Sequence, residues 1–148
     1  MGHRVVGGVM AVLAVSIAAC GESPAPPAST GGAGRVFFVQ PKNGDTIKTL
    51  STIEFGSEGV TVAAVPPGEL KPEQVRPGII HYHLGTDTDC LPPGTVIPKA
   101  APWVHFGDGK NVIETQLTPG QHRLAVQAGD DMHVTLPGLC EVITVTVE

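Results

Sequence analysis

Apolar and polar residues alternate over short stretches of this chain, and glycines and prolines separate the stretches. In residues 51–57, for example, Ile53 and Phe55 fall on one side and Glu54 on the other. This period of two is typical of a β-strand with one buried face. The same signals predict about seven strands, at residues 35–40, 51–57, 60–65, 78–84, 111–117, 121–128 and 141–147.

No stretch shows a sustained helical period. Residues 69–75 form at most one helical turn, because Pro72 interrupts them. Short strands separated by turn signals favour an all-β fold, and we expect an immunoglobulin-like antiparallel β-sandwich of about seven strands. In the penultimate strand Leu124, Val126 and Ala128 share one face.

The N-terminal segment has a different character. A basic start ending at Arg4 precedes an apolar stretch that is too short for a membrane-spanning helix. The stretch ends in Ile17-Ala18-Ala19-Cys20, which resembles the lipobox of bacterial lipoproteins, in which the cysteine is acylated and becomes the new N-terminus. We therefore expect a signal peptide at 1–19 and a palmitate-type lipid anchor on Cys20. The alternative is an ordinary secretory signal in which Cys20 has no role.

Residues 20–34 are small and rich in proline, so they predict a flexible linker between the lipid and a folded domain at 35–148. The location implied is the cell envelope, with the protein anchored to a bacterial membrane and its domain facing the periplasm or the exterior. After loss of Arg4 with the signal, 8 basic residues face 14 acidic ones, a formal charge of −6. An acidic chain argues against nucleic acid as a partner, since phosphate binding needs clustered Lys and Arg.

Three cysteines occur, and the lipobox accounts for one of them. Cys90 and Cys140 remain, in a compartment that permits disulfides. Each lies beside a turn-like segment, so we expect them to pair. The alternative is two free, buried thiols.

Histidines are the main candidates for chemistry. His81 and His83 are two apart on an expected strand, so their side chains leave the same face. Such a pair can direct two imidazoles to one metal ion, and His105 or His122, each beside a glycine-containing turn, would supply a third ligand. The metal would be copper or zinc, and its binding should weaken as the pH falls through about 6.5. The alternatives are a solvent-facing stripe, or buried histidines that hydrogen-bond to fix the packing.

Other candidates are weaker. Carboxylates at 87–89 and 130–131 could bind Ca²⁺, but acidic loops are more often solvated. Trp103 is expected in the core. The chain has no nucleophile elbow, phosphate loop or metalloprotease helix, so we expect no enzymatic activity and no certain cofactor.

A series of short motifs follows in order along the chain: 38–44 (FVQPKNG), 54–56 (EFG), 59–60 (GV), 81–84 (HYHL), 105–109 (HFGDG) and 117–124 (LTPGQHRL). Together they resemble the bacterial domain of unknown function family 4399, over nearly all of residues 36–147. This resemblance implies an exported, often lipid-anchored β-domain and supplies no established activity. The family carries three consecutive histidines where this chain has Tyr82 between His81 and His83.

The main functional prediction is a lipid-anchored, non-enzymatic β-sandwich that binds an envelope protein or a small ligand. The alternative is an envelope metal-binding protein for copper or zinc that uses His81, His83 and one or both of His105 and His122.

Overall fold

The computed structural model describes residues 1–3 and 34–148. The expected lipidation site Cys20, with most of the expected signal and linker, lies outside the described residues. Among the described residues, no helix is long and apolar enough to cross a membrane. The strands are β1 (Arg35–Gln40), β2 (Thr46–Ile47), β3 (Leu50–Glu58), β4 (Thr61–Val62), β5 (Ile79–Thr86), β6 (Trp103–Phe106), β7 (Val112–Gln116), β8 (Gly120–Gly129) and β9 (Thr135–Val147), with one 3₁₀ turn, η1 (Pro72–Gln74).

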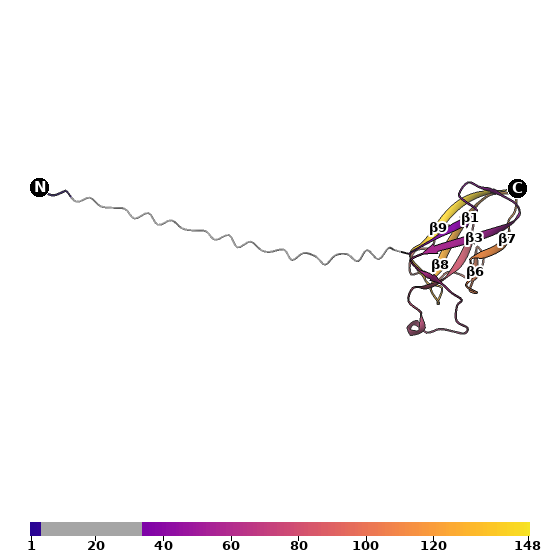
Figure 1. Ribbon diagram of the computed structural model, residues 1–148, viewed down its shortest axis with the longest axis horizontal. Helices are drawn as coiled ribbons and strands as arrows, with labels where there is room; N and C mark the ends of the chain where they lie inside the picture. The colour runs from indigo at the N-terminus through magenta and orange to yellow at the C-terminus, as the bar shows by residue number, and fades with distance from the viewer. Residues whose placement is uncertain (4–33) are drawn as a thin grey trace. The chain divides into compact units, whose positions relative to one another are not determined.

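The strands form two sheets, so the expected all-β sandwich is confirmed (Figure 1). The first sheet has the order β1-β3-β7. The second has the order β2-β9-β8-β5-β4, with β6 pairing with β5 as well. The pairing is antiparallel except for two contacts of two residues each, β2 with β9 and β4 with β5.

One hydrophobic core lies between the sheets. The ring of Phe55 on β3 packs against those of Phe38 and Tyr82, with centroid distances of 5.7 and 5.1 Å. Tyr82 is 1% exposed and shares its core-facing side of β5 with Ile80 and Leu84. From β8, Leu124, Val126 and Ala128 enter the same core, as their alternation predicts.

The outer face of the second sheet is buried as well, because the segment 87–102 between β5 and β6 folds over it. Trp103, Ile97 and Ala125 form a second apolar cluster there. The side chain of Gln127 acts like an extra strand partner: its oxygen accepts from the Leu91 N–H and its amide donates to the Leu91 carbonyl, both at 2.9 Å. Burial on both faces explains why the polar residues of β5 are as inaccessible as the apolar ones.

A disulfide fixes this covering segment. It joins Cys90 to Cys140 on β9, with Cα atoms 6.1 Å apart, which is the pairing expected from the sequence. The cross-link spans 50 residues, for which the chain-entropy model gives about 4 kcal/mol of stabilisation. Such a bond is typical of proteins that fold in an oxidising compartment.

The structure differs from the predicted strand set in four places. β2 and β6 are additional strands of two and four residues, and only Thr61–Val62 of the expected strand 60–65 is a strand. β9 starts at Thr135, six residues before the predicted start. Residues 136–139, which include the turn-like segment 136–138 beside Cys140, form a bulge, because Gln127 pairs with Cys140 while Gly129 pairs with Thr135.

Candidate metal centre

Four histidines converge on the outer face of the second sheet. His81 and His83 point away from the core because they alternate with Ile80, Tyr82 and Leu84 along β5. His105 on β6 lies directly opposite His83 in the antiparallel register. His133 comes from the loop between β8 and β9, next to Gly129, which is the register partner of His81.

The four rings are in mutual contact. Their centroids are 4.6 to 5.6 Å apart. The Nε2 atoms of His105 and His133 are 3.0 Å apart and share one hydrogen bond. Each histidine offers one ring nitrogen that lies within 4.8 Å of the other three. The arrangement therefore places four nitrogen donors around one small volume.

The inner pair of the cluster is buried without hydrogen-bond partners. His81 is 1% exposed and His83 is fully buried. Among the described residues, Nε2 of His81 and both ring nitrogens of His83 make no hydrogen bond of normal geometry, although the backbone of Gln127 is close enough to oppose, weakly, the lowering of the His83 pKa. Leaving a buried polar group unpaired costs about 1–3 kcal/mol, so three such atoms at one place call for a ligand or another functional explanation.

The electrostatic surroundings keep the rings neutral. The pKa of His81 is lowered to about 3 and that of His83 to about 2, mainly by burial. Repulsion between the histidines lowers both pKa values further. Burial also lowers the pKa values of His105 and His133, and the positive charge of Lys99 lowers both further. Neutral imidazole is the metal-binding form, so the set is ready for a cation at neutral pH.

Two glycines give the outer histidines their room. A Cβ at Gly107 would meet the His105 ring, with only 2.7 Å to Nε2. A Cβ at Gly129 would lie 3.0 Å from the backbone of His133. His133 itself has φ +67°, a left-handed conformation that is uncommon outside glycine. Backbone strain of this kind is common at functional sites, where the surrounding structure holds the residue in the unfavourable conformation.

The loop that carries His133 is held rigidly. Asp130 accepts hydrogen bonds from the N–H groups of Met132 and Val134, at 2.8 and 2.9 Å. The neighbouring Asp131 is buried and receives a two-pronged ion pair from Arg76, at 2.9 and 2.7 Å. Arg76 also donates to the carbonyl of Ala64, so it ties the segment between β4 and β5 to this loop.

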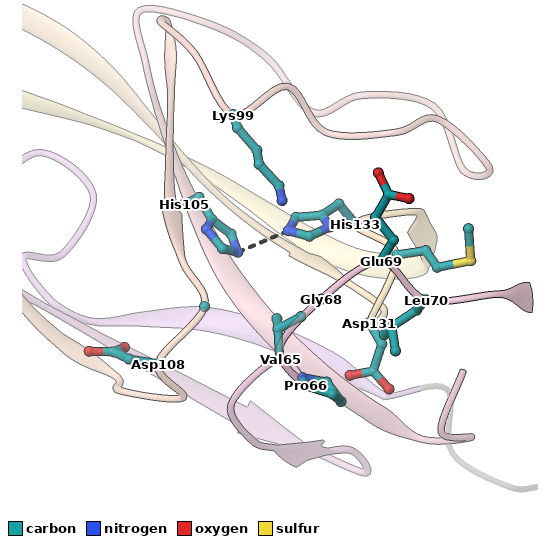
Figure 2. A pocket seen from close by; sticks show the side chains of 12 residues that line it. Val65, Pro66, Gly68, Glu69, Leu70, Lys99, His105, Asp108, Asp131 and His133 are labelled. Carbon is teal, nitrogen blue, oxygen red and sulfur yellow. Dashed lines mark hydrogen bonds between the residues drawn. The ribbon is translucent and has the colours of Figure 1, made fainter. Parts of the chain in front are cut away.

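An open pocket of about 760 Å³ leads to the cluster, and His105 and His133 line it (Figure 2). The two rings point toward each other on its wall, and Lys99 extends toward them from the covering segment. His81 and His83 do not line the pocket, so they lie behind the outer pair. The pocket therefore connects the outer pair of histidines, His105 and His133, with solvent.

His122 is not part of this cluster, which corrects its place among the predicted ligands. It lies seven residues before Gly129 on β8, about 23 Å along an extended strand. Its Nδ1 is 2.9 Å from a carboxylate oxygen of Asp87, and its Nε2 is 2.8 Å from the carbonyl of Thr118. These two acceptors raise the pKa of His122 above its usual value. His133, present in the sequence but not chosen as a ligand, takes the fourth position.

The remaining candidates have structural partners. Asp87 bonds to His122 and Asp89 to Arg123, while Asp130 and Asp131 hold the loop described above. Their carboxylates are thus already engaged within the protein, which leaves little support for a Ca²⁺ site. Trp103 is 3% exposed and packs in the second apolar cluster, as expected.

Position 82 does not affect the cluster, although it departs from the family's run of three histidines. Tyr82 faces the opposite side of β5 and contacts Phe55 in the core. A side chain at this position cannot reach the outer face, because successive residues of a strand point to opposite sides.

A solved structure described as fibronectin(III)-like modules of CbhA from Clostridium thermocellum aligns with a TM-score of 0.45 and 11% sequence identity, over 76% of this chain and 96% of that chain. None of the curated proteins compared with the chain matches it. The model of a family described as a domain of unknown function, DUF4399, matches residues 53–148, which include all four clustered histidines and both disulfide cysteines. The chain belongs to this DUF4399 family.

Proposed function

We propose that this protein is a non-enzymatic metal-binding module that holds one copper or zinc ion through His81, His83, His105 and His133. The observation that carries the proposal is the set of three buried ring nitrogens without partners, one on His81 and two on His83. They lie beside two further imidazoles at the end of an open pocket. A bound ion would satisfy the nitrogen that each ring turns toward it.

A purely structural role explains the inner pair poorly. Histidines that fix packing are hydrogen-bonded when buried, and an unpaired ring in that position lowers stability. Aliphatic side chains would fill the same volume without that cost. The unpaired nitrogens therefore lower the stability of the metal-free protein. A ligand that pairs with them would restore this stability on binding, which supports a binding role for the cluster.

The donor set favours copper or zinc over hard cations. Imidazole nitrogens suit zinc and copper, whereas calcium and magnesium prefer oxygen ligands. Bonds of about 2.0–2.1 Å place neighbouring nitrogens of a tetrahedral site about 3.4 Å apart. The 3.0 Å between His105 and His133 is near this value, and the 4.8 Å limit for the whole set requires only small ring movements.

Four protein ligands support binding rather than catalysis. Zinc enzymes usually offer three protein ligands and keep one position open for water or substrate. The buried carboxylate beside the cluster, Asp131, is held by Arg76 and is poorly placed to accept a proton. The envelope location and the lipid anchor on Cys20 belong to this proposal as well, and the disulfide agrees with an oxidising compartment.

The test is calorimetric titration of Cu²⁺ and Zn²⁺ into tag-free protein at pH 7.5 and 5.5. We expect saturable binding of one ion tighter than about 10 μM, and its loss in the His81→Ala/His83→Ala double variant. The matched control is His122→Ala, which removes an imidazole outside the cluster and should leave affinity unchanged. Binding that is absent, or equal in both variants, would contradict the proposal.

A further inference from the structure

The pocket in front of the cluster is larger than a metal ion needs. Its volume of about 760 Å³ lies within the range of sites that bind small organic molecules. The segment between β4 and β5 forms one wall and contributes the half-buried side chains of Val65, Pro66 and Leu70. The histidines and Lys99 lie on the other side (Figure 2).

The charges around the pocket leave a positive excess once a divalent ion is bound. Four neutral imidazoles bring no charge to the ion. The carboxylate of Asp131 is neutralised by Arg76, and that of Asp108 by Lys110 at 2.8 Å. Lys99 has no ion-pair partner within residues 34–148, and its charge reaches His105 and His133, whose pKa values it lowers.

Within the described part of the chain, Glu69 is the only remaining acidic side chain on the pocket lining, and it is exposed. An exposed carboxylate on a long side chain compensates buried charge weakly, because water screens it. The net positive charge around the pocket therefore favours binding of an anion from solution. The apolar wall favours an anion that also carries an apolar group.

We propose that the metal-loaded protein binds a small organic carboxylate in this pocket, with the carboxylate between Lys99 and the histidine cluster and the apolar body against Val65, Pro66 and Leu70. This inference rests on the proposed metal site. Because binding free energies are reciprocal, the carboxylate must raise metal affinity by the same factor as the metal raises carboxylate affinity.

The experiment measures the affinity of benzoate for the full chain with and without Zn²⁺, by calorimetry at pH 7.5. We expect the zinc-loaded protein to bind benzoate at least about tenfold more tightly than the metal-free protein, a typical size for such coupling. Acetate carries the same charge without the apolar body and should bind more weakly. Chloride at equal concentration should not compete with benzoate.

Lys99→Met separates this inference from the metal site itself. Without benzoate the variant should bind Zn²⁺ as tightly as the wild type or more tightly, because a like charge has been removed. Its zinc-loaded form should bind benzoate at least about tenfold more weakly than the loaded wild type. The control is Lys48→Met, which removes an exposed lysine that does not line the pocket and should change neither affinity.

The outcomes distinguish the two proposals. Absence of Zn²⁺ binding in the wild type contradicts the metal site. Two outcomes overturn the carboxylate pocket alone, provided that Zn²⁺ binds. The first is a benzoate affinity that is equal with and without the metal, and the second is a benzoate affinity that is equal in the wild type and Lys99→Met. Displacement of benzoate by chloride as effective as that by acetate would also overturn it, since neither the carboxylate nor the apolar wall would then be recognised.

Discussion

His83 and His105 lie directly opposite each other on neighbouring antiparallel strands, with ring centroids 5.2 Å apart, yet neither nitrogen of His83 has a hydrogen-bond partner among the described residues. Two polar rings thus contact each other in a buried place without satisfying each other. In the metal-free protein, the His83 side chain fills buried volume as an apolar residue would. It also lowers the stability of the fold, because its polar nitrogens lose contact with water and gain no hydrogen bond.

Replacing His83 with leucine should therefore stabilise the metal-free protein. We expect His83→Leu to raise the free energy of unfolding by about 1–3 kcal/mol, because it removes two unpaired buried nitrogens. The same variant should lose metal affinity. Urea denaturation at pH 7.5 with a chelator present measures the first effect and calorimetry the second. A drop in stability would instead indicate that His83 fixes the packing through hydrogen bonds.

The pH dependence of stability follows from the lowered pKa values of the inner pair. The folded pKa values of His81 and His83, about 3 and 2, lie below the unfolded value of about 6.5. As the pH falls below 6.5 the unfolded chain binds protons that the folded protein excludes. Stability present above pH 6.5 is then lost, at up to about 1.4 kcal/mol per pH unit for each histidine.

Denaturation of the metal-free protein at pH 7.5, 5.5 and 4.5 measures this slope, and His83→Leu should have a shallower one. His122 has the opposite sign: its raised pKa gives stability below 6.5 that is lost as the pH rises through its folded pKa. A wild type whose stability does not fall between pH 7.5 and 4.5 would contradict the neutral, buried state of the inner pair.

Two substitutions at His133, which has a left-handed backbone, separate the effect of backbone strain from the effect of losing a ligand. His133→Gly and His133→Ala both remove the imidazole, so both should weaken metal binding by a similar factor. Glycine adopts φ +67° freely, whereas alanine does so at a cost of about 1–2 kcal/mol. We expect the glycine variant to be the more stable by that amount in thermal or urea unfolding. Equal stabilities would mean that the loop relaxes once the ring is gone.

Gly107→Ala tests the room that His105 needs. The added Cβ would lie 2.7 Å from Nε2 of His105, the atom that faces His133, so the ring must move away. The φ of Gly107 is not in the left-handed region, so alanine fits the backbone. We expect metal affinity to fall at least about tenfold, as in His105→Ala, with a change in stability of at most about 1 kcal/mol. Wild-type affinity in Gly107→Ala would show that His105 is not a ligand in this ring position.

Anchoring is tested at Cys20, outside the described residues. Cys20→Ala removes the expected acyl acceptor, so the protein should remain unprocessed or leave the membrane fraction. Membrane fractionation and gel mobility of the expressed full chain provide the measurement. A variant that fractionates and migrates like the wild type would disprove the lipoprotein interpretation.

Alternation predicted the long strands because each has one face in the core. It identified the core side of β5 and β8 for that reason, and therefore also the shared outer side of His81 and His83. It missed β6, because four residues after a proline-rich segment are too few to show a period. The turn-like segment 136–138 lies within a bulge of β9 and does not mark a strand end.

The fourth histidine of the cluster could not be identified from spacing. His122 lies near a Pro-Gly turn and looked like a suitable strand-edge donor, whereas His133 follows two aspartates that suggested a solvated loop. Only the antiparallel register of β5 and β8 shows that residues near Gly129, and not those near Gly120, meet His81. The sequence did show that His122 lies near the start of its strand and His133 just after its end. This difference identifies the ligand candidate only when the pairing of that strand with the strand of His81 is known.

The histidines and the hydrophobic core occupy opposite faces of the same strand, β5, and this separation has an evolutionary consequence. A relative can exchange the outer side chains without repacking the interior, so ancestry and ligand binding can diverge within one family. Membership therefore indicates a common scaffold. Under the proposed function, relatives that keep histidines at the positions equivalent to 81, 83, 105 and 133 would bind the same ion, and relatives that lack them would not.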